Sequence, residues 1–425
     1  MSTVRTLSTP MHGLLERFST REAHPPLYFL QLKAWHALHM RSLVNLRANS
    51  ALWGTVSLCL VYLAARFYGG EPAGLLALGF LVFSPLHLAY SQEMRPYAMA
   101  MALGLAALLA LEHRRWIALG LFWTALLYTH YWGAFVVLGQ ATYGLYTFRA
   151  KVHRKALAIV TGSAALLFAA WVPILWTQLG YVDGMAFWVP GFSMANLGKV
   201  FLAFTGIFFN VASWIFFLPT KVWVIALLGL LFTVALMKGL LQGRLGPVAW
   251  LVLGLLVPWL LSLWKPGIYL WYRYPVLMLP AFAILVALGV QTIKYVPVRV
   301  AIACVLIGSQ VWGSWVYFHS WQKANPKAVV QYVHWLRGPD SVVVRPSYFS
   351  DLFSFYDQGT SVTLDENVFD SPEKRAALKG KKVILLAFDV PSDPVVEAFL
   401  GEFKTLSGRY FPGTAHLGIT VYQLK

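Results

Sequence analysis

Residues 72–112 read PAGLLALGFLVFSPLHLAY, then SQEMRPY, then AMAMALGLAALLALE, which is two apolar runs on either side of a short polar turn. A helix that crosses a bilayer takes roughly 17–25 apolar residues, and the two runs approach or meet that length. The turn holds Glu93 and Arg95, and such charges are costly inside hydrocarbon. The stretch therefore predicts two membrane-spanning helices with polar side chains at one membrane face.

The composition extends this interpretation to the whole chain. Of 425 residues, 58% are hydrophobic and 12% are charged, whereas soluble domains carry about 25% charged residues. We expect an α-helical polytopic membrane protein, and the composition excludes a disordered chain, a coiled coil and a disulfide scaffold. Cys59 and Cys304 lie in apolar runs far apart, so we expect small core residues and no disulfide.

Apolar runs predict about ten transmembrane helices, whose ends are set by turns and charges. An interfacial helix at 27–46 and a long outer loop at 177–221, with a re-entrant or interfacial stretch at 201–218, complete this region. The ten expected spans are 48–67, 72–91, 97–112, 116–132, 133–149, 156–176, 222–238, 247–264, 275–293 and 298–318.

Charge patterning gives the expected orientation. The net charge is +17, and basic residues gather in alternate loops, which should therefore be cytoplasmic. Membrane topology explains this charge better than nucleic-acid binding does, so we expect membrane lipids and no nucleic acid as partners. Glu71 and Glu112 fall in cytoplasmic turns and should be solvated. A bacterial-type inner or plasma membrane is expected.

The tail differs in composition from the rest. Strand-like runs at 341–344, 362–364, 382–388 and 418–423 alternate with helical patterns at 326–337, 372–379 and 393–404. This alternation predicts a small α/β domain with a partly parallel sheet, outside the cytoplasm. The expected domains are 1–46, an outer-face segment with the interfacial helix; 47–320, the transmembrane bundle; and 321–425, the extracytoplasmic α/β domain.

The N-terminal segment does not fit the charge rule. Residues 1–23 are polar, lack the apolar core of a signal peptide, and lie on the expected outer side together with several arginines. The simplest expectation is that a spanning helix is missing from this end, and a genuinely short variant is the weaker alternative.

Two outer turns hold the first candidate residues. Glu93 is a candidate base or hydroxyl-orienting group, although a structural pair with Arg95 is equally open. Pro96 can begin the next helix, which places Tyr97 at the same face. His24 precedes two prolines that fix the chain at the water boundary, and its position raises it from a structural to a candidate catalytic residue.

Later outer segments add candidates for substrate binding. Arg273, flanked by tyrosines that include Tyr274, offers forked donors to a phosphate, although a snorkelling anchor is the alternative. Lys265 is close enough in sequence to share either task. His130 ends an outward span in THYW, where an aromatic belt with a hydrogen-bonded histidine is favoured over a substrate contact. No metal-ligand spacing is visible.

Three segments, HPPLYF at 24–29, SPLHLAYSQEMRPYAM at 84–99 and YRYPVLMLPAFAILVALG at 272–289, occur in this order in the GT-C membrane glycosyltransferases. Over residues 15–320 the chain resembles the branch that contains the bacterial protein-mannosyltransferase-like and aminoarabinose-transferase-like enzymes. THYWG at 129–133 also looks like a short outward motif of this branch.

The resemblance implies a hexosyl- or pentosyltransferase that moves a sugar from a polyprenyl-phosphate carrier to an acceptor glycan, lipid or protein on the outer face. By position, Arg273 would bind the lipid phosphate, His24 would lie near it, and Glu93 would match the family's carboxylate. The resemblance implies no certain cofactor and leaves a divalent cation open.

One departure from the family pattern bears on activity. The family's principal catalytic Asp precedes the HPP motif, and residues 1–23 contain no Asp. Three explanations follow: the natural chain starts earlier, the chain is a catalytically inactive binding protein, or Glu93 or Glu22 substitutes. A lipid or glycan transporter is a separate alternative, which the lack of an inverted repeat disfavours.

Overall fold

The structure is a computed structural model in which the chain forms two compact units, residues 6–316 and residues 317–425 with 1–5. We describe each unit by itself. The structure describes residues 9–20, 22–38, 43–185, 192–207, 220–265, 268–270, 273–320, 326–336, 341–344, 376–388, 400–411 and 419–424, with Thr3, Thr6, Leu7 and Glu373.

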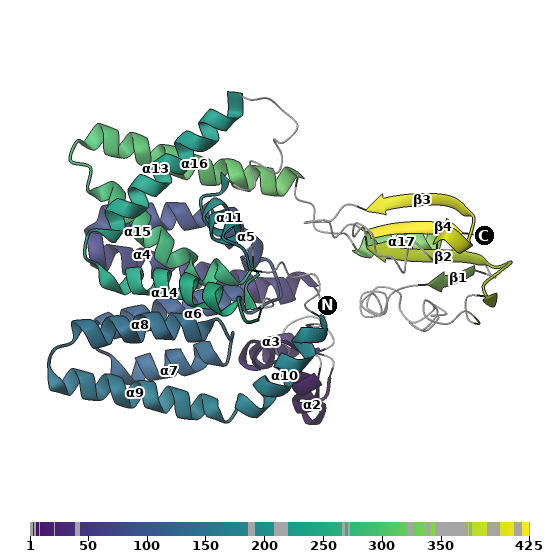
Figure 1. Cartoon of the computed structure of the whole chain (residues 1–425), viewed down its shortest axis with the longest axis horizontal. Coiled ribbons are helices and arrows are strands. Elements are labelled where there is room, and N and C mark those ends of the chain that lie inside the picture. Colours follow the sequence, from purple (N-terminus) through teal and green to yellow (C-terminus); the bar gives the residue numbers. More distant parts are fainter. Residues whose placement is uncertain are drawn as a thin grey trace. The chain divides into compact units, whose positions relative to one another are not determined.

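The larger unit is a helical bundle (Figure 1). It begins with η1 (Met11–Gly13), α2 (Leu14–Thr20) and α3 (Leu27–Leu38), and α3 confirms a helix in the segment predicted at 27–46. The remaining helices are α4 (Leu43–Val82), α5 (Pro85–Ser91), α6 (Tyr97–Glu112), α7 (Trp116–Leu127), α8 (Gly133–Thr147), α9 (Lys151–Ala169), α10 (Val172–Met185), α11 (Ala195–Phe204), α13 (Thr220–Leu240), α14 (Leu245–Leu261), η4 (Tyr274–Met278), α15 (Leu279–Gln291) and α16 (Val296–Ser320).

These helices confirm the predicted α-helical polytopic membrane fold. Among the described residues, five helices are long and apolar enough to cross a bilayer, and four shorter apolar helices accompany them. The longest, α4, is kinked at Gly70, whose φ is +76° and which precedes Pro72. Because a left-handed conformation favours glycine, Gly70 separates the first two predicted spans where the sequence placed their boundary.

The prediction of a long outer loop at 177–221 is wrong in part, because helices form within it. Residues 177–185 belong to α10, which starts at Val172 directly after α9 ends at Ala169. Residues 195–204 form α11, and 208–219 lie outside the described residues. The prediction of buried cysteines is also wrong, because Cys59 and Cys304 are free and exposed. Apolar side chains on a helix that faces lipid read like core positions in sequence.

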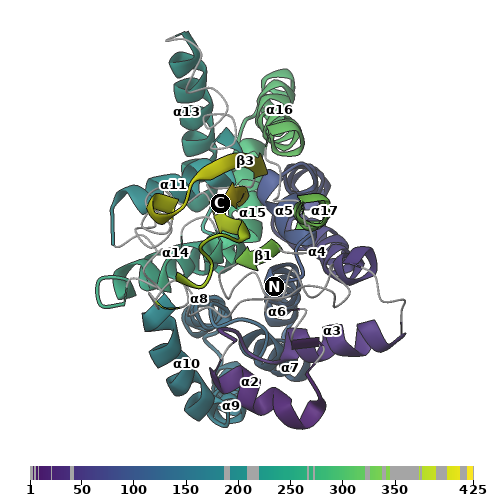
Figure 2. The same cartoon turned by 90° about the vertical axis from the view of Figure 1, so that its right-hand side faces the viewer.

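Helix α15 is the centre of the bundle, and it packs against α4, α13 and α14 (Figures 1 and 2). Every residue from Leu279 to Val290 is buried. Two glycines allow its crossing with α13. A Cβ atom at Gly289 would collide with the carbonyl oxygen of Ala235, and one at Gly239 with that of Leu285. Small residues at such crossings let helix backbones approach closely in membranes.

Two helices end inside the bundle, and α16 satisfies the carbonyl groups that they free. The Oγ of Ser314 donates a hydrogen bond to Phe83 O (2.6 Å), at the break between α4 and α5. The Nε2 of Gln310 donates to Phe204 O (3.0 Å), at the end of α11. Non-helical backbone at membrane depth persists only where such partners exist.

Glu112 differs from its prediction. It ends α6 half-buried, and its carboxylate accepts a hydrogen bond from the hydroxyl of Tyr68 on α4. The prediction that Glu112 is fully solvated is therefore wrong, because its carboxylate is partly removed from water and bonded to another helix. Glu71 does lie exposed, in an ion pair with Arg66 (3.1 Å).

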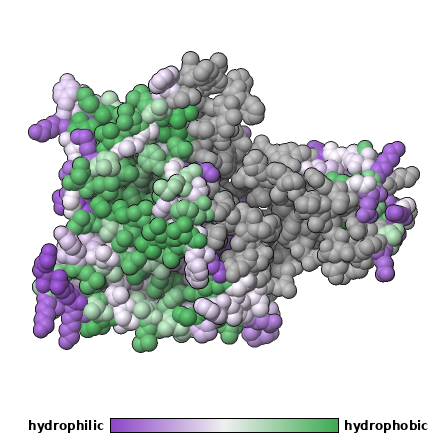
Figure 3. Space-filling view, viewed as in Figure 1, coloured by the Kyte–Doolittle hydropathy of each residue, from purple (hydrophilic) through white to green (hydrophobic). Residues whose placement is uncertain are grey.

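The surface of the helices is largely apolar, as a bilayer requires (Figure 3). Hydrophilic side chains gather at the turn between α8 and α9, where Arg149, Lys151, Arg154 and Lys155 are exposed. This turn is one of the basic loops for which we predicted a cytoplasmic location, and that location stays a prediction.

The smaller unit contains a four-stranded sheet of β1 (Ser341–Val344), β2 (Lys382–Phe388), β3 (Thr405–Phe411) and β4 (Ile419–Leu424) in the order β1-β2-β4-β3. The pair β1–β2 is parallel and the other pairs are antiparallel, which confirms a partly parallel sheet. Helix α17 (Pro326–Leu336) packs Val329, Val330 and Val333 on one face. Strand β3 was not predicted, and the run 362–364 lies outside the described residues.

Candidate active site

The HPP segment connects α2 to α3 and lies against the end of α7. The backbone N–H of Leu27 donates a hydrogen bond to Tyr128 O (2.9 Å). Pro25 and Pro26 fix the chain direction just before α3 begins. His24 is thereby held, with a buried side chain, beside the α7–α8 turn that carries His130.

Four aromatic rings from separate segments meet here, and we call them the ring cluster: the buried His24, Tyr97 and His130, and the half-buried Tyr274. The ring centroids of His24 and His130 lie 4.9 Å apart, and those of Tyr97 and His130 lie 5.3 Å apart. Tyr274 packs on His130 at 5.6 Å. The structure thus brings together four of the residues that the sequence singled out, over 250 positions of chain.

Charged groups surround the ring cluster. Arg95 and Arg273 both act electrostatically on His24, and both act on Tyr97 together with Glu93. Two guanidinium groups and a carboxylate, from two turns far apart in sequence, therefore lie near the buried ring of Tyr97. This arrangement suits an anionic ligand, because guanidinium groups hold their charge and offer forked donors.

Glu22 completes the charge arrangement. Its carboxylate is buried and lies 3.4 Å from the Nη1 of Arg95, in an ion pair between residues 73 positions apart. The sequence left a structural Glu93–Arg95 pair open, and the structure shows that Glu22 is also an ion-pair partner of Arg95. The REAHPP sequence shows an acid near the HPP motif, but its burial depends on the fold and could not be predicted.

Both histidines of the ring cluster are held neutral. Burial, followed by repulsion from His130, Arg95 and Arg273, lowers the pKa of His24 well below its usual 6.5. Burial and the charge of Arg95 lower the pKa of His130 to about 3. Neither imidazole adds a charge at neutral pH, so the positive charge comes from the arginines.

The remaining candidates are less closely placed. Lys265 lies just beyond α14, with its ammonium 5.9 Å from the ring centre of Trp264, and its role stays a prediction. Tyr272 is outside the described residues. Among the described residues, no three His, Cys, Asp or Glu side chains lie close enough to hold a metal ion.

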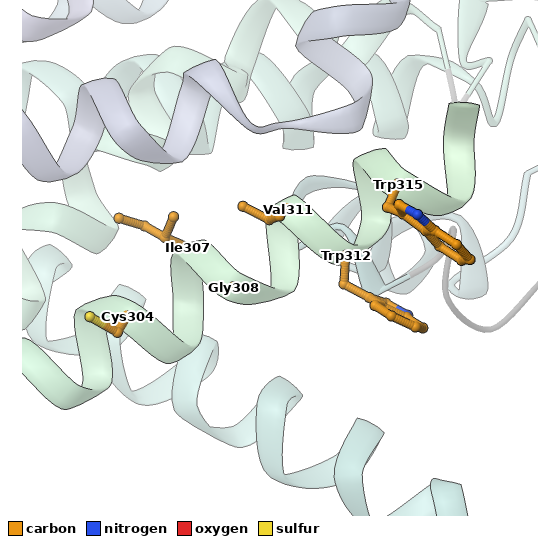
Figure 4. A pocket seen from close by; sticks show the side chains of 6 residues that line it. All are labelled: Cys304, Ile307, Gly308, Val311, Trp312 and Trp315. Carbon is orange, nitrogen blue, oxygen red and sulfur yellow. The ribbon is translucent and has the colours of Figure 1, made fainter. Parts of the chain in front are cut away.

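An apolar hollow of about 460 Å³ lies along α16 (Figure 4). Its lining includes Trp312 and Trp315, whose rings stack with centroids 5.1 Å apart, and the sulfur of Cys304. Such a surface suits a hydrocarbon chain, but its lining supplies almost no polar group for chemistry.

Comparisons with known proteins identify the fold. The family model described as dolichyl-phosphate-mannose-protein mannosyltransferase matches residues 23–176, which include the HPP and SQE segments and His130. No curated protein sequence matches the chain.

Two solved structures resemble the chain over nearly its whole length. ArnT from Cupriavidus metallidurans in the apo state is 12% identical with a TM-score of 0.53, and the match covers 96% of this chain and 91% of that one. ArnT from the same organism bound to undecaprenyl phosphate is 13% identical with a TM-score of 0.51, covering 94% and 87%.

The chain therefore has the GT-C glycosyltransferase fold and is a multi-pass membrane protein, as the resemblance implied.

Proposed function

We propose that the chain transfers a sugar from a polyprenyl-phosphate carrier to an acceptor on the outer face of the membrane. The observation that carries this proposal is that Arg95 and Arg273 both exert their charge on His24 and Tyr97, two buried members of the ring cluster. A pair of cations beside uncharged hydrogen-bonding rings fits a lipid phosphate better than it fits a neutral lipid. The GT-C fold supports the choice of a glycosyl carrier.

In the proposed reaction, an acceptor hydroxyl oxygen attacks the anomeric carbon as the bond from that carbon to the phosphate oxygen breaks. The phosphate leaves with the bonding electrons, and Arg273 stabilises the charge that develops on it. Glu93 takes the proton of the acceptor hydroxyl. Glu22 is the second carboxylate near the site and takes no proton in this step. Because Glu22 is paired with Arg95, its proposed task is to orient Arg95.

The other candidates have binding roles in this proposal. Tyr97 and Tyr274 line the donor site, His24 lies beside the phosphate, and Lys265 is a further contact for the phosphate at the rim. The outer-face location, the identity of the sugar and that of the acceptor belong to the proposal, as does any divalent cation.

A transfer assay tests the proposal. Purified protein in lipid nanodiscs is given a radiolabelled polyprenyl-phosphate sugar and a membrane extract as acceptor source. We expect transfer that Arg273→Ala abolishes and Glu93→Gln reduces by about 10²–10⁴-fold, the usual contribution of a general base. Transfer by Arg273→Ala at the parent rate would contradict the phosphate assignment.

A further inference from the structure

His130 occupies the middle of the ring cluster. Its imidazole contacts the rings of His24, Tyr97 and Tyr274, which come from the HPP segment, the start of α6 and η4. The side chain is buried. A residue that contacts every other member of the ring cluster is well placed to contact any ligand held by that cluster.

The protonation state of His130 follows from one hydrogen bond. Its Nδ1 accepts the backbone N–H of Trp132 at 3.1 Å. A nitrogen that accepts this bond cannot carry a proton, so the neutral ring carries its proton on Nε2. Adding a proton at Nδ1 would break the bond to Trp132. His130 is therefore an uncharged N–H donor and not a proton acceptor.

Two buried donors of the ring cluster lack partners within the described part of the chain. The Nε2 of His130 and the hydroxyl of Tyr97 are both inaccessible to solvent and make no hydrogen bond there. A buried polar group without a partner is costly, and native proteins keep few of them without a reason. Both donors lie where Arg95 exerts its charge, and Tyr97 also lies under the influence of Arg273.

We propose that the Nε2–H of His130 and the O–H of Tyr97 donate hydrogen bonds to the phosphate oxygens of the polyprenyl-phosphate donor. This inference rests on the proposed function and adds two uncharged donors to the charge of Arg273. Neutral donors stabilise the leaving phosphate without competing for the acceptor proton. The phosphate oxygens would also supply the acceptors that these two donors lack among the described residues.

Tyr269 provides a matched control. Its hydroxyl is also buried and makes no hydrogen bond within the described residues, and its ring lies 5.5 Å from that of Trp132, next to the ring cluster. The hydroxyl of Tyr269 is desolvated by burial, as that of Tyr97 is, but it is not under the charges of Arg95 and Arg273 that act on Tyr97. Removing this hydroxyl changes a buried tyrosine without changing the proposed phosphate contacts.

The experiment measures binding of undecaprenyl phosphate, of a polyprenyl-phosphate sugar and of undecaprenol, which has the same chain without the phosphate. The proteins are the parent chain, His130→Leu, His130→Gln, Tyr97→Phe and Tyr269→Phe in nanodiscs. We expect His130→Leu and Tyr97→Phe to weaken binding of both phosphate lipids roughly tenfold, in line with loss of a hydrogen bond to a charged group. His130→Gln, which keeps a donor near the Nε2 position, should retain most of the affinity, and Tyr269→Phe should bind as the parent does.

Other outcomes separate the two proposals. Unchanged affinity of His130→Leu and Tyr97→Phe for undecaprenyl phosphate would overturn the inference, and so would an equal loss for undecaprenol. A loss confined to the sugar-bearing lipid would also overturn it, because the contact would then be to a sugar hydroxyl. A parent chain that binds neither phosphate lipid would contradict the proposed function itself. If His130→Leu fails to fold, the Tyr97→Phe and Tyr269→Phe pair decides the matter.

Discussion

Glu22 and Arg95 form an ion pair, 3.4 Å between Oε1 and Nη1, that joins the segment before α3 to the turn before α6. The Glu22 carboxylate is 2% exposed and Arg95 is 25% exposed. Because a buried charge that loses its partner keeps its desolvation cost, this pair should hold the HPP segment in place beside the ring cluster.

The pair predicts a measurable coupling. We expect Glu22→Gln to lower the thermal unfolding midpoint in detergent, with a loss of roughly 1–3 kcal/mol because Arg95 is partly solvated. A double-mutant cycle with Arg95→Gln measures the interaction directly. Additive effects of the two substitutions would show that the ion pair contributes nothing to stability. Glu16→Gln, at an acid of α2, serves as the control and should change little.

The glycine crossing of α13 and α15 predicts a steric effect. Gly239→Ala places a methyl group against the carbonyl of Leu285, and overpacking of this kind costs about 1–3 kcal/mol or more. Gly229→Ala on the same helix meets nothing within 4 Å, so it should be neutral or slightly stabilising. Unfolding midpoints of the two variants test this contrast, and equal midpoints would argue against the close crossing.

The α16 hydrogen bonds predict a polar requirement at membrane depth. Gln310→Leu removes the donor to Phe204 O and should destabilise the protein by about 1–3 kcal/mol, the cost of a buried carbonyl left without a partner. Val311→Ala, an exposed neighbour on α16, should leave the unfolding midpoint nearly unchanged. A Gln310→Leu midpoint equal to that of Val311→Ala would refute the assignment.

The two neutral histidines predict acid sensitivity. Their pKa values are depressed in the fold, so below pH 6.5 the unfolded chain binds protons that the folded chain does not. The stability that neutral His130 contributes is complete above pH 6.5 and falls by about 1.4 kcal/mol per pH unit as the pH drops towards about 3. Unfolding midpoints at pH 8, 6.5 and 5 measure this.

His130→Asn should reduce the slope below pH 6.5, because it removes one of the buried histidines that take up a proton when the chain unfolds. An identical pH dependence in the variant and the parent would mean that His130 is not the buried neutral group described.

Much of the fold could be predicted from sequence because lipid imposes length and composition on each span. The kink at Gly70 and the strand at 382–388 follow from local residues alone. The helix break at Ser84–Pro85 was not predicted. It is stabilised by a hydrogen bond from Ser314, which is distant in sequence, to the carbonyl oxygen of Phe83. Strand β3 was missed because TLSGRYF lacks clear alternation and has only β4 as a neighbour, with an irregular register at Thr405–Ser407.

For the site, sequence motifs brought His24, Glu93, Arg95 and Arg273 to attention individually. Their mutual distances, the burial of Glu22 and the tautomer of His130 arise from packing between the HPP segment, the α7–α8 turn and η4. No local pattern encodes such contacts. The favoured sequence expectation for His130, an aromatic belt with a hydrogen-bonded histidine, describes its ring neighbours correctly, but it does not account for the buried Nε2–H.

Photo-crosslinking tests the central claim most directly, because it locates the lipid phosphate on the chain. A polyprenyl phosphate with a photoreactive group beside the phosphate is irradiated with the protein, and the labelled peptides are identified with and without excess undecaprenyl phosphate. We predict competed labelling within residues 22–28, 93–97, 129–132 and 273–274. Competed labelling only at the opposite helix ends, around Glu112 and Arg149–Lys151, would contradict the account.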